Sequence, residues 1–93
     1  SHVMSYEWDP AKSESNLYKH GVHFADAVAV LEDERALWRE DVGEWDEDRY
    51  IAVGIDHLGR VLIVVFTIRG ETVRLISARP ATRNERSTYE QRR

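Results

Sequence analysis

Apolar residues recur with a helical period in the first third of the chain and with a strand period after it. Asp9-Pro10 has the form of a helix N-cap followed by proline at the first helical position, and Gly21 supplies a stop, so the sequence predicts a helix over residues 10–20. A second helix is predicted next, because four apolar residues recur at i, i+3, i+4 and i+7, the spacing of one buried face. They are Phe24, Ala27, Val28 and Leu31, and the pattern ends at the acidic run 32–34.

The rest of the chain predicts a sheet that is closed by a third helix. Alternation and β-branched residues predict strands, two short and three longer, at residues 6–8, 36–39, 49–56, 61–67 and 72–78. The 61–67 segment is apolar throughout, which favours a central strand covered on both faces. Thr82-Arg83-Asn84-Glu85 has the Thr-x-x-Glu form of a capping box and starts the last helix at Thr82. The predicted fold is α+β: a single antiparallel sheet of three to five strands with two N-terminal helices and one C-terminal helix.

Length and composition predict one small soluble domain. The 93 residues leave room for a single hydrophobic core, and 42% hydrophobic with 32% charged residues is typical of a globular domain. Ser1-His2-Val3 resembles a cloning remnant before Met4, so we expect a single domain over residues 4–93. The chain has no cysteine, which excludes disulfides and thiolate metal sites, and its apolar run at 61–66 is too short to cross a bilayer. We therefore expect a cytoplasmic protein that has no membrane partner.

The charge of the chain is unevenly distributed. A net charge of −4 argues at first against a nucleic-acid partner, because lysine and arginine supply most of the nonspecific affinity for phosphates. Residues 1–56 carry 5 basic and 14 acidic side chains, whereas residues 57–93 carry 8 basic and 3 acidic ones. All 8 of the later basic residues are arginine, whose planar fork suits bidentate contact with phosphate. On charge alone, an ordinary solvated surface accounts for this asymmetry slightly better than a phosphate-binding face.

Two groups of side chains are candidates for chemistry. The sequence has no phosphate loop, no zinc-ligand spacing and no Ser-His-Asp order, which argues against a metal enzyme, and we expect no cofactor. On the first helix, Lys12, Asn16 and Lys19 share one stripe, and His20 adjoins its end. On the last helix, a basic edge with a phenol is predicted from Arg83, Arg86 and Tyr89. An ordinary polar helix face explains either group at least as well as a phosphate-binding role does.

Three segments resemble the BrnT toxin family. They are Tyr6-x-Trp8-Asp9-x-x-Lys12-x-x-x-Asn16-x-x-Lys19-His20-Gly21-Val22-x-Phe24-x-x-Ala27, Glu47-x-Arg49-x-Ile51-Ala52-x-Gly54 and Ile76-Ser77-Ala78-Arg79-x-Ala81-x-x-x-Glu85-Arg86-x-x-Tyr89. The resemblance covers nearly the whole chain after Met4. It implies a RelE/ParE-like toxin fold, RNA cleavage that arrests growth, and a BrnA-like antitoxin with a ribbon-helix-helix DNA-binding domain. It also implies that the toxin–antitoxin complex represses its own promoter.

The resemblance gives the two candidate groups a chemical role. Metal-free RNA cleavage needs a base, an acid for the leaving oxygen, and positive charge around the phosphorane. The expected catalytic residues are Arg79, Arg86, Tyr89 and the titratable His20, with the Tyr89 ring as a donor or stacking platform. The expected RNA-binding residues are Lys12, Lys19, Arg69 and Arg83.

Geometry limits this expectation, and two other classes of function stay open. Arg69 and Arg79 end neighbouring antiparallel strands, so they should lie about 25 Å apart and cannot contact one phosphate. A gyrase-poisoning toxin of the ParE kind would share the expected fold without cutting RNA. A nonenzymatic module would use the same basic face only to bind the antitoxin or a nucleic acid.

Overall fold

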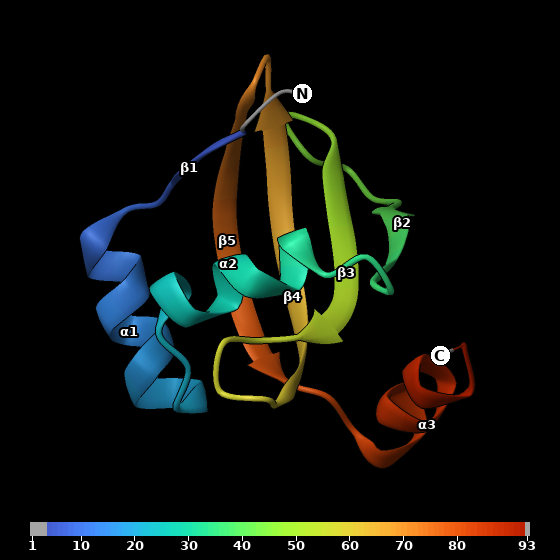
Figure 1. The fold of residues 1–93 in the computed structure, drawn as a ribbon. Helices are drawn as coiled ribbons and strands as arrows, with labels where there is room; N and C mark the ends of the chain where they lie inside the picture. The colour runs from blue at the N-terminus through green and yellow to red at the C-terminus, as the bar shows by residue number, and fades with distance from the viewer. Residues whose placement is uncertain (1–3, 93) are drawn as a thin grey trace.

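The computed structural model describes residues 4–92 and shows a five-stranded sheet flanked by three helices (Figure 1). The elements are β1 (Ser5–Glu7), α1 (Pro10–His20), α2 (Phe24–Glu32), β2 (Leu37–Asp41), β3 (Arg49–Ile55), β4 (Val61–Arg69), β5 (Thr72–Pro80) and α3 (Arg83–Arg92). The α+β class and the three helices are as predicted. The expected cloning remnant lies outside the described residues. No helix within residues 4–92 is long and apolar enough to cross a membrane.

Local capping chemistry fixes the two N-terminal helices. The carboxylate of Asp9 accepts a hydrogen bond from the backbone N–H of Ala11 at 2.9 Å, which satisfies a donor at the start of α1. Gly21 ends the helix in the left-handed conformation, at φ 70°, which glycine adopts without a steric penalty. In α2 the fully buried residues are Phe24, Ala27 and Val30. The predicted helix boundaries are confirmed, but Val30, which was not among the four predicted stripe residues, is fully buried, whereas Val28 and Leu31 are only partly buried.

The sheet is mixed, with strand order β1-β5-β4-β3-β2. The pairs β2–β3, β3–β4 and β4–β5 are antiparallel, as predicted, whereas β1 runs parallel to β5. The prediction of a wholly antiparallel sheet is therefore wrong at this edge. The reason lies in the connection, because β1 pairs with the beginning of β5 and the chain then enters α1, which packs beside the end of β5. A chain that moves along the edge in this direction must run parallel to β5.

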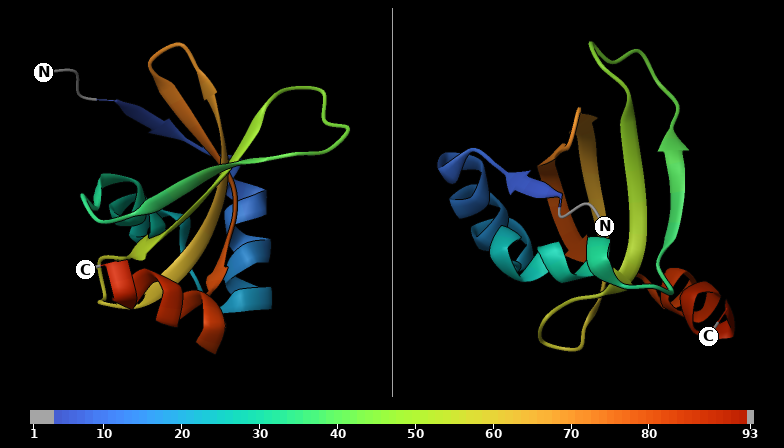
Figure 2. Two further views of the ribbon diagram at one scale, coloured as in Figure 1. Left: turned by 90° about the vertical axis from the view of Figure 1, so that its right-hand side faces the viewer. Right: turned by 45° about the horizontal axis from the view of Figure 1, so that its top comes forward.

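The central strand β4 is packed by helices on one face only. Its residues Leu62, Val64 and Phe66 are fully buried against the α2 side. The opposite face carries Ile63 and the half-buried Val65, which line an open groove. The predicted cover on both faces is therefore only partial on this side, where Ile63 is buried but Val65 is half-buried, because α3 reaches only one end of the sheet (Figure 2). This leaves an aliphatic sheet face accessible to a ligand.

Candidate active site

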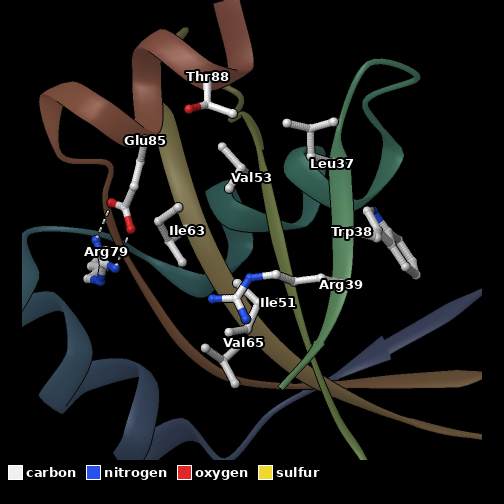
Figure 3. A pocket seen from close by; sticks show the side chains of 10 residues that line it. All are labelled: Leu37, Trp38, Arg39, Ile51, Val53, Ile63, Val65, Arg79, Glu85 and Thr88. Atoms are coloured by element: carbon white, nitrogen blue, oxygen red, sulfur yellow. Dashed lines mark hydrogen bonds and ion pairs between the residues drawn. The ribbon is translucent and has the colours of Figure 1, made fainter. Parts of the chain in front are cut away.

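A groove of about 340 Å³ lies on the sheet face opposite α2 (Figure 3). Branched aliphatic side chains of β3 and β4 form its floor, and these are Ile51, Val53, Ile63 and Val65. Polar side chains from three elements stand around it, and these are Arg39 of β2, Arg79 of β5, and Glu85 and Thr88 of α3. The ring of Trp38 points away from the groove and packs edge-on against Phe66, with centroids 4.8 Å apart. The groove therefore combines an apolar floor with a charged wall.

The charged wall is a bidentate ion pair between β5 and α3. Nη1 and Nη2 of Arg79 donate to Oε1 and Oε2 of Glu85 at 2.8 and 2.9 Å. The Arg79 side chain is 41% exposed and the Glu85 side chain 32%. The hydrogen bonds from Arg79, with smaller contributions from the backbone and hydroxyl of Thr82, lower the pKa of Glu85 to about 2 against the opposing effect of burial. The carboxylate is therefore ionised at neutral pH and holds the guanidinium in place.

Glu85 is also fixed by the predicted capping box. The backbone N–H of Thr82 donates to Glu85 Oε1 at 2.8 Å, and the backbone N–H of Glu85 donates to Thr82 Oγ1 at 3.2 Å. These reciprocal bonds satisfy two donors at the start of α3. The same carboxylate thus caps the helix and binds Arg79. Only the first of these roles is predicted from the sequence.

The basic stripe of α1 lies on the same side of β5 as Arg79. Lys12, Lys19 and His20 are exposed, and together with Ser77 they line a second hollow of about 190 Å³. Ser77 pairs with Val65, which lines the groove, so both side chains are on the open sheet face. Ser77 and Arg79 are two residues apart in one strand and share this face. The structure therefore places three of the predicted α1 residues along the same strand as the predicted catalytic arginine, although they line a separate hollow.

Asn16 has a structural role that the sequence analysis did not anticipate. Its side chain is buried, and its amide donates to the carbonyls of Val22 at 3.0 Å and Ala78 at 2.8 Å. Its oxygen accepts from the backbone N–H of Ala78 at 3.1 Å. Asn16 thereby pairs with the β5 edge as a neighbouring strand would. It holds α1 in place and, unlike Lys12 and Lys19, is not exposed on the stripe.

Tyr89 lies in the core. Its side chain is 1% exposed, and its hydroxyl donates to Asp33 Oδ2 at 2.5 Å. Burial alone would raise the pKa of Asp33, but hydrogen bonds from Tyr89 and from the backbone N–H groups of Ile55 and Arg35 outweigh it, and the pKa lies below its ordinary value. The expectation of a stacking platform does not fit a ring at this depth. Tyr89 instead anchors α3 to the segment that follows α2.

Arg83 and Arg86 are exposed on α3 and are not among the residues that line the groove. Arg86 lines a separate hollow with Arg60 and the loop that follows β5. Glu85 and Thr88, by contrast, face the groove. The expected cluster of Arg79, Arg86 and Tyr89 is therefore divided among the groove, a second surface and the core.

Arg69 lies at the far end of the sheet from Arg79. In the β4–β5 register Arg69 pairs with Thr72, whereas Arg79 pairs with Ile63, so the predicted separation of the two arginines is confirmed. Arg69 forms a bidentate ion pair with Glu47, at 2.7 and 3.1 Å. Among residues 4–92, no three His, Asp or Glu side chains are grouped in a way that could hold a metal ion.

Comparison with known proteins identifies the family. A family model described as the ribonuclease toxin BrnT of a type II toxin–antitoxin system matches residues 8–85. The chain belongs to the BrnT family. A structural match comes from the crystal structure of the Brucella abortus ribonuclease toxin BrnT, which is 27% identical over 87% of this chain and 100% of that chain, with a TM-score of 0.64. No curated protein sequence matches.

Family membership defines the broad function, and the family match extends over the strands that form the groove. BrnT proteins are ribonuclease toxins of type II systems, so RNA and an antitoxin are the relevant classes of partner. The matched segment includes the α1 stripe, Ser77, Arg79 and Glu85. The residues around β5 thus belong to the part of the chain that carries the family pattern.

Proposed function

We propose that this BrnT-family protein is a metal-independent endoribonuclease that cleaves RNA on the open sheet face beside Arg79. The observation that carries this proposal is the arrangement around β5, where Glu85 holds Arg79 and the exposed Lys12, Lys19 and His20 flank the same face. A planar guanidinium binds phosphate, lysines follow the nucleic-acid backbone, and an imidazole transfers protons near neutral pH. These are the groups that attack by a ribose 2′-hydroxyl requires.

The proposed roles are assigned from the chemistry of each side chain, and its position around β5 supports them. The 2′-hydroxyl attacks the adjacent phosphorus, its proton leaves to a base, and the departing 5′-oxygen receives a proton. His20 serves one or both of these transfers, and Arg79 stabilises the charge that develops on the phosphorane. Lys12 and Lys19 bind the flanking backbone, whereas Arg69, Arg83 and Arg86 extend RNA contact beyond the groove. Arg69 lies at the far end of β4, too far from Arg79 to share its phosphate, and Arg83 and Arg86 are on α3 outside the groove lining.

Cleavage of RNA by the purified protein in EDTA tests this proposal. We expect cleavage without added metal, products that end in a 2′,3′-cyclic phosphate, and no reaction at a 2′-O-methyl nucleotide. Arg79→Ala should lower the cleavage rate about 10²–10³-fold, as expected for the loss of one preorganised charge-stabilising group. Lys12→Ala and Lys19→Ala should each mainly weaken binding and reduce its salt dependence by about one unit of slope.

The alternative classes give different results in the same assay. Cleavage that requires added Mg²⁺ would overturn metal independence. Intact RNA together with gyrase-dependent DNA breaks would support a gyrase poison, and intact RNA and DNA would support a nonenzymatic module. A naturally inactive copy would also leave RNA intact, so the growth of expressing cells should be measured alongside.

The proposed partner is a BrnA-like antitoxin. The type II family requires an antitoxin, and we propose that its ribbon-helix-helix domain carries the complex to the promoter DNA. The exposed Arg83 and Arg86 on α3 and the free face of Arg79 suit an antitoxin segment that supplies carboxylates. Expression of the toxin alone should arrest growth, and co-expression of the cognate antitoxin should restore it.

A further inference from the structure

The hydrogen-bond donors of Arg79 are used unevenly. A guanidinium has five N–H donors, two on each Nη and one on Nε. Nη1 donates to Glu85 Oε1 at 2.8 Å and to the carbonyl of Pro80 at 3.2 Å, and Nη2 donates to Glu85 Oε2 at 2.9 Å. Among the described residues, no acceptor is found for Nε–H or for the second N–H of Nη2. These two donors lie on one edge of the planar group and form a second fork.

The second fork belongs to a side chain that is partly exposed and that is bound by a carboxylate held at a helix cap. The Arg79 side chain is 41% exposed at the wall of the groove (Figure 3). The Glu85 carboxylate is tied to the backbone N–H of Thr82, so it remains with the first turn of α3. A carboxylate held in this way fixes the plane of the guanidinium.

We infer that Glu85 is a positioning residue, which binds the end of the Arg79 guanidinium and leaves the Nε/Nη2 edge free to receive an RNA phosphodiester. Two parallel N–H donors match two phosphate oxygens in the bidentate geometry that arginine forms with phosphate. Glu85 makes no contact with RNA in this arrangement. The inference rests on the proposed function, because it takes RNA as the ligand of Arg79.

Glu85→Gln separates positioning from helix capping. Glutamine is accepted at this position of a capping box, so the bond from Thr82 is retained. Its side-chain NH₂ would face the Nη2 donor of Arg79, however, and two donors repel each other. We expect kcat for RNA cleavage to fall about 10–100-fold, the effect of a small misplacement of a reacting group. Affinity for RNA should not fall, since the change removes a negative charge beside the binding face.

Three matched variants serve as controls. Glu90→Gln removes the same charge from an exposed position of α3 and should retain the parental kcat. Thr82→Ala weakens the cap without replacing either member of the ion pair. It should therefore lower the melting temperature and leave kcat close to the parental value. The double variant Arg79→Glu with Glu85→Arg restores an ion pair at this place. It should regain thermal stability without regaining cleavage, because the phosphate-binding fork no longer projects from β5.

A binding measurement keeps this inference distinct from the proposed function. The Nε–Hε resonance of Arg79 can be followed by NMR while an RNA oligonucleotide with 2′-O-methyl sugars is added. We expect the chemical shift of this resonance to change on addition of RNA in the parent protein, and to change much less in Glu85→Gln. A parental kcat in Glu85→Gln, or an unshifted Arg79 resonance in a protein that cleaves RNA, would overturn the positioning role. A shifted resonance in a protein that does not cleave RNA would support the role of Glu85 and refute the nuclease.

Discussion

Removal of the Asn16 side chain should detach α1 from the β5 edge. The Asn16 amide makes three hydrogen bonds, two to the backbone of Ala78 and one to Val22. Each such bond contributes about 1 kcal/mol net, and the fully buried Ala78 would lose its partners for both N–H and C=O. We therefore expect Asn16→Ala to lower the free energy of unfolding by about 3 kcal/mol. For a domain of this size, that corresponds to a fall in melting temperature of roughly 12–24 °C.

The functional consequence follows from the position of Asn16. It lies on α1 between the two lysines and is bonded to the residue before Arg79. A loosened α1 would no longer hold Lys12, Lys19 and His20 beside the open face. RNA affinity should therefore fall together with stability, in contrast to Lys12→Ala, which should weaken binding and leave the melting temperature unchanged.

Thermal and urea unfolding, with RNA binding measured on the same preparations, test this expectation. Ser15→Ala changes the exposed neighbour on the same helix and should alter stability by less than about 0.5 kcal/mol. Asn16→Asp keeps the acceptor for Ala78 but sets a carboxylate against two carbonyl oxygens. Because the folded state favours its protonated form, this variant should gain stability as the pH falls. An Asn16→Ala protein that melts within about 4 °C of the parent would show that other contacts hold α1.

The remaining predictions concern α3. Arg79 lowers the pKa of Glu85 from 4.5 to about 2, so the ion pair stabilises the fold above pH 4.5 and is lost as the pH falls toward 2. Glu85→Gln should flatten the dependence of melting temperature on pH in this window. Tyr89→Phe should cost about 2 kcal/mol in urea unfolding, because it removes a hydrogen bond to a carboxylate, and should leave the cleavage rate of the folded protein unchanged. Arg83→Glu combined with Arg86→Glu should weaken antitoxin binding, most at low salt, in calorimetric titrations.

Elements that depend on local chemistry could be predicted from the sequence. The N-cap at Asp9, the left-handed Gly21 and the Thr82–Glu85 box each involve residues that are close in sequence, and all three form as expected. Every strand end was predicted to within two residues, because alternation and β-branching are also local signals. The direction of β1 relative to β5 could not be predicted from local signals, because it depends on where α1 packs.

The candidate site was harder to predict, because helical spacing does not say what a stripe faces. The stripe with Lys12, Asn16 and Lys19 exists, but it faces the β5 edge. The short Asn16 side chain reaches the backbone there, while the longer lysines extend past it to solvent. On α3, steps of three residues rotate the side-chain direction by about 60° each, so Tyr89 points about 120° away from Arg83. This rotation takes Tyr89 into the core.

The Arg79–Glu85 pair could not be predicted, because the predicted end of the β5 strand is two residues too early. The predicted strand covers residues 72–78 with Arg79 at its very end, so the prediction did not define the face of the sheet on which Arg79 lies. The observed strand continues to Pro80, and its pairing of Arg79 with Ile63 places the arginine on the groove face. Between Pro80 and the first residue of the capping box the chain has only Ala81, so the Glu85 carboxylate has to lie close to the strand end. An extension of β5 by two residues thus converts a helix cap and a candidate arginine into one bidentate pair.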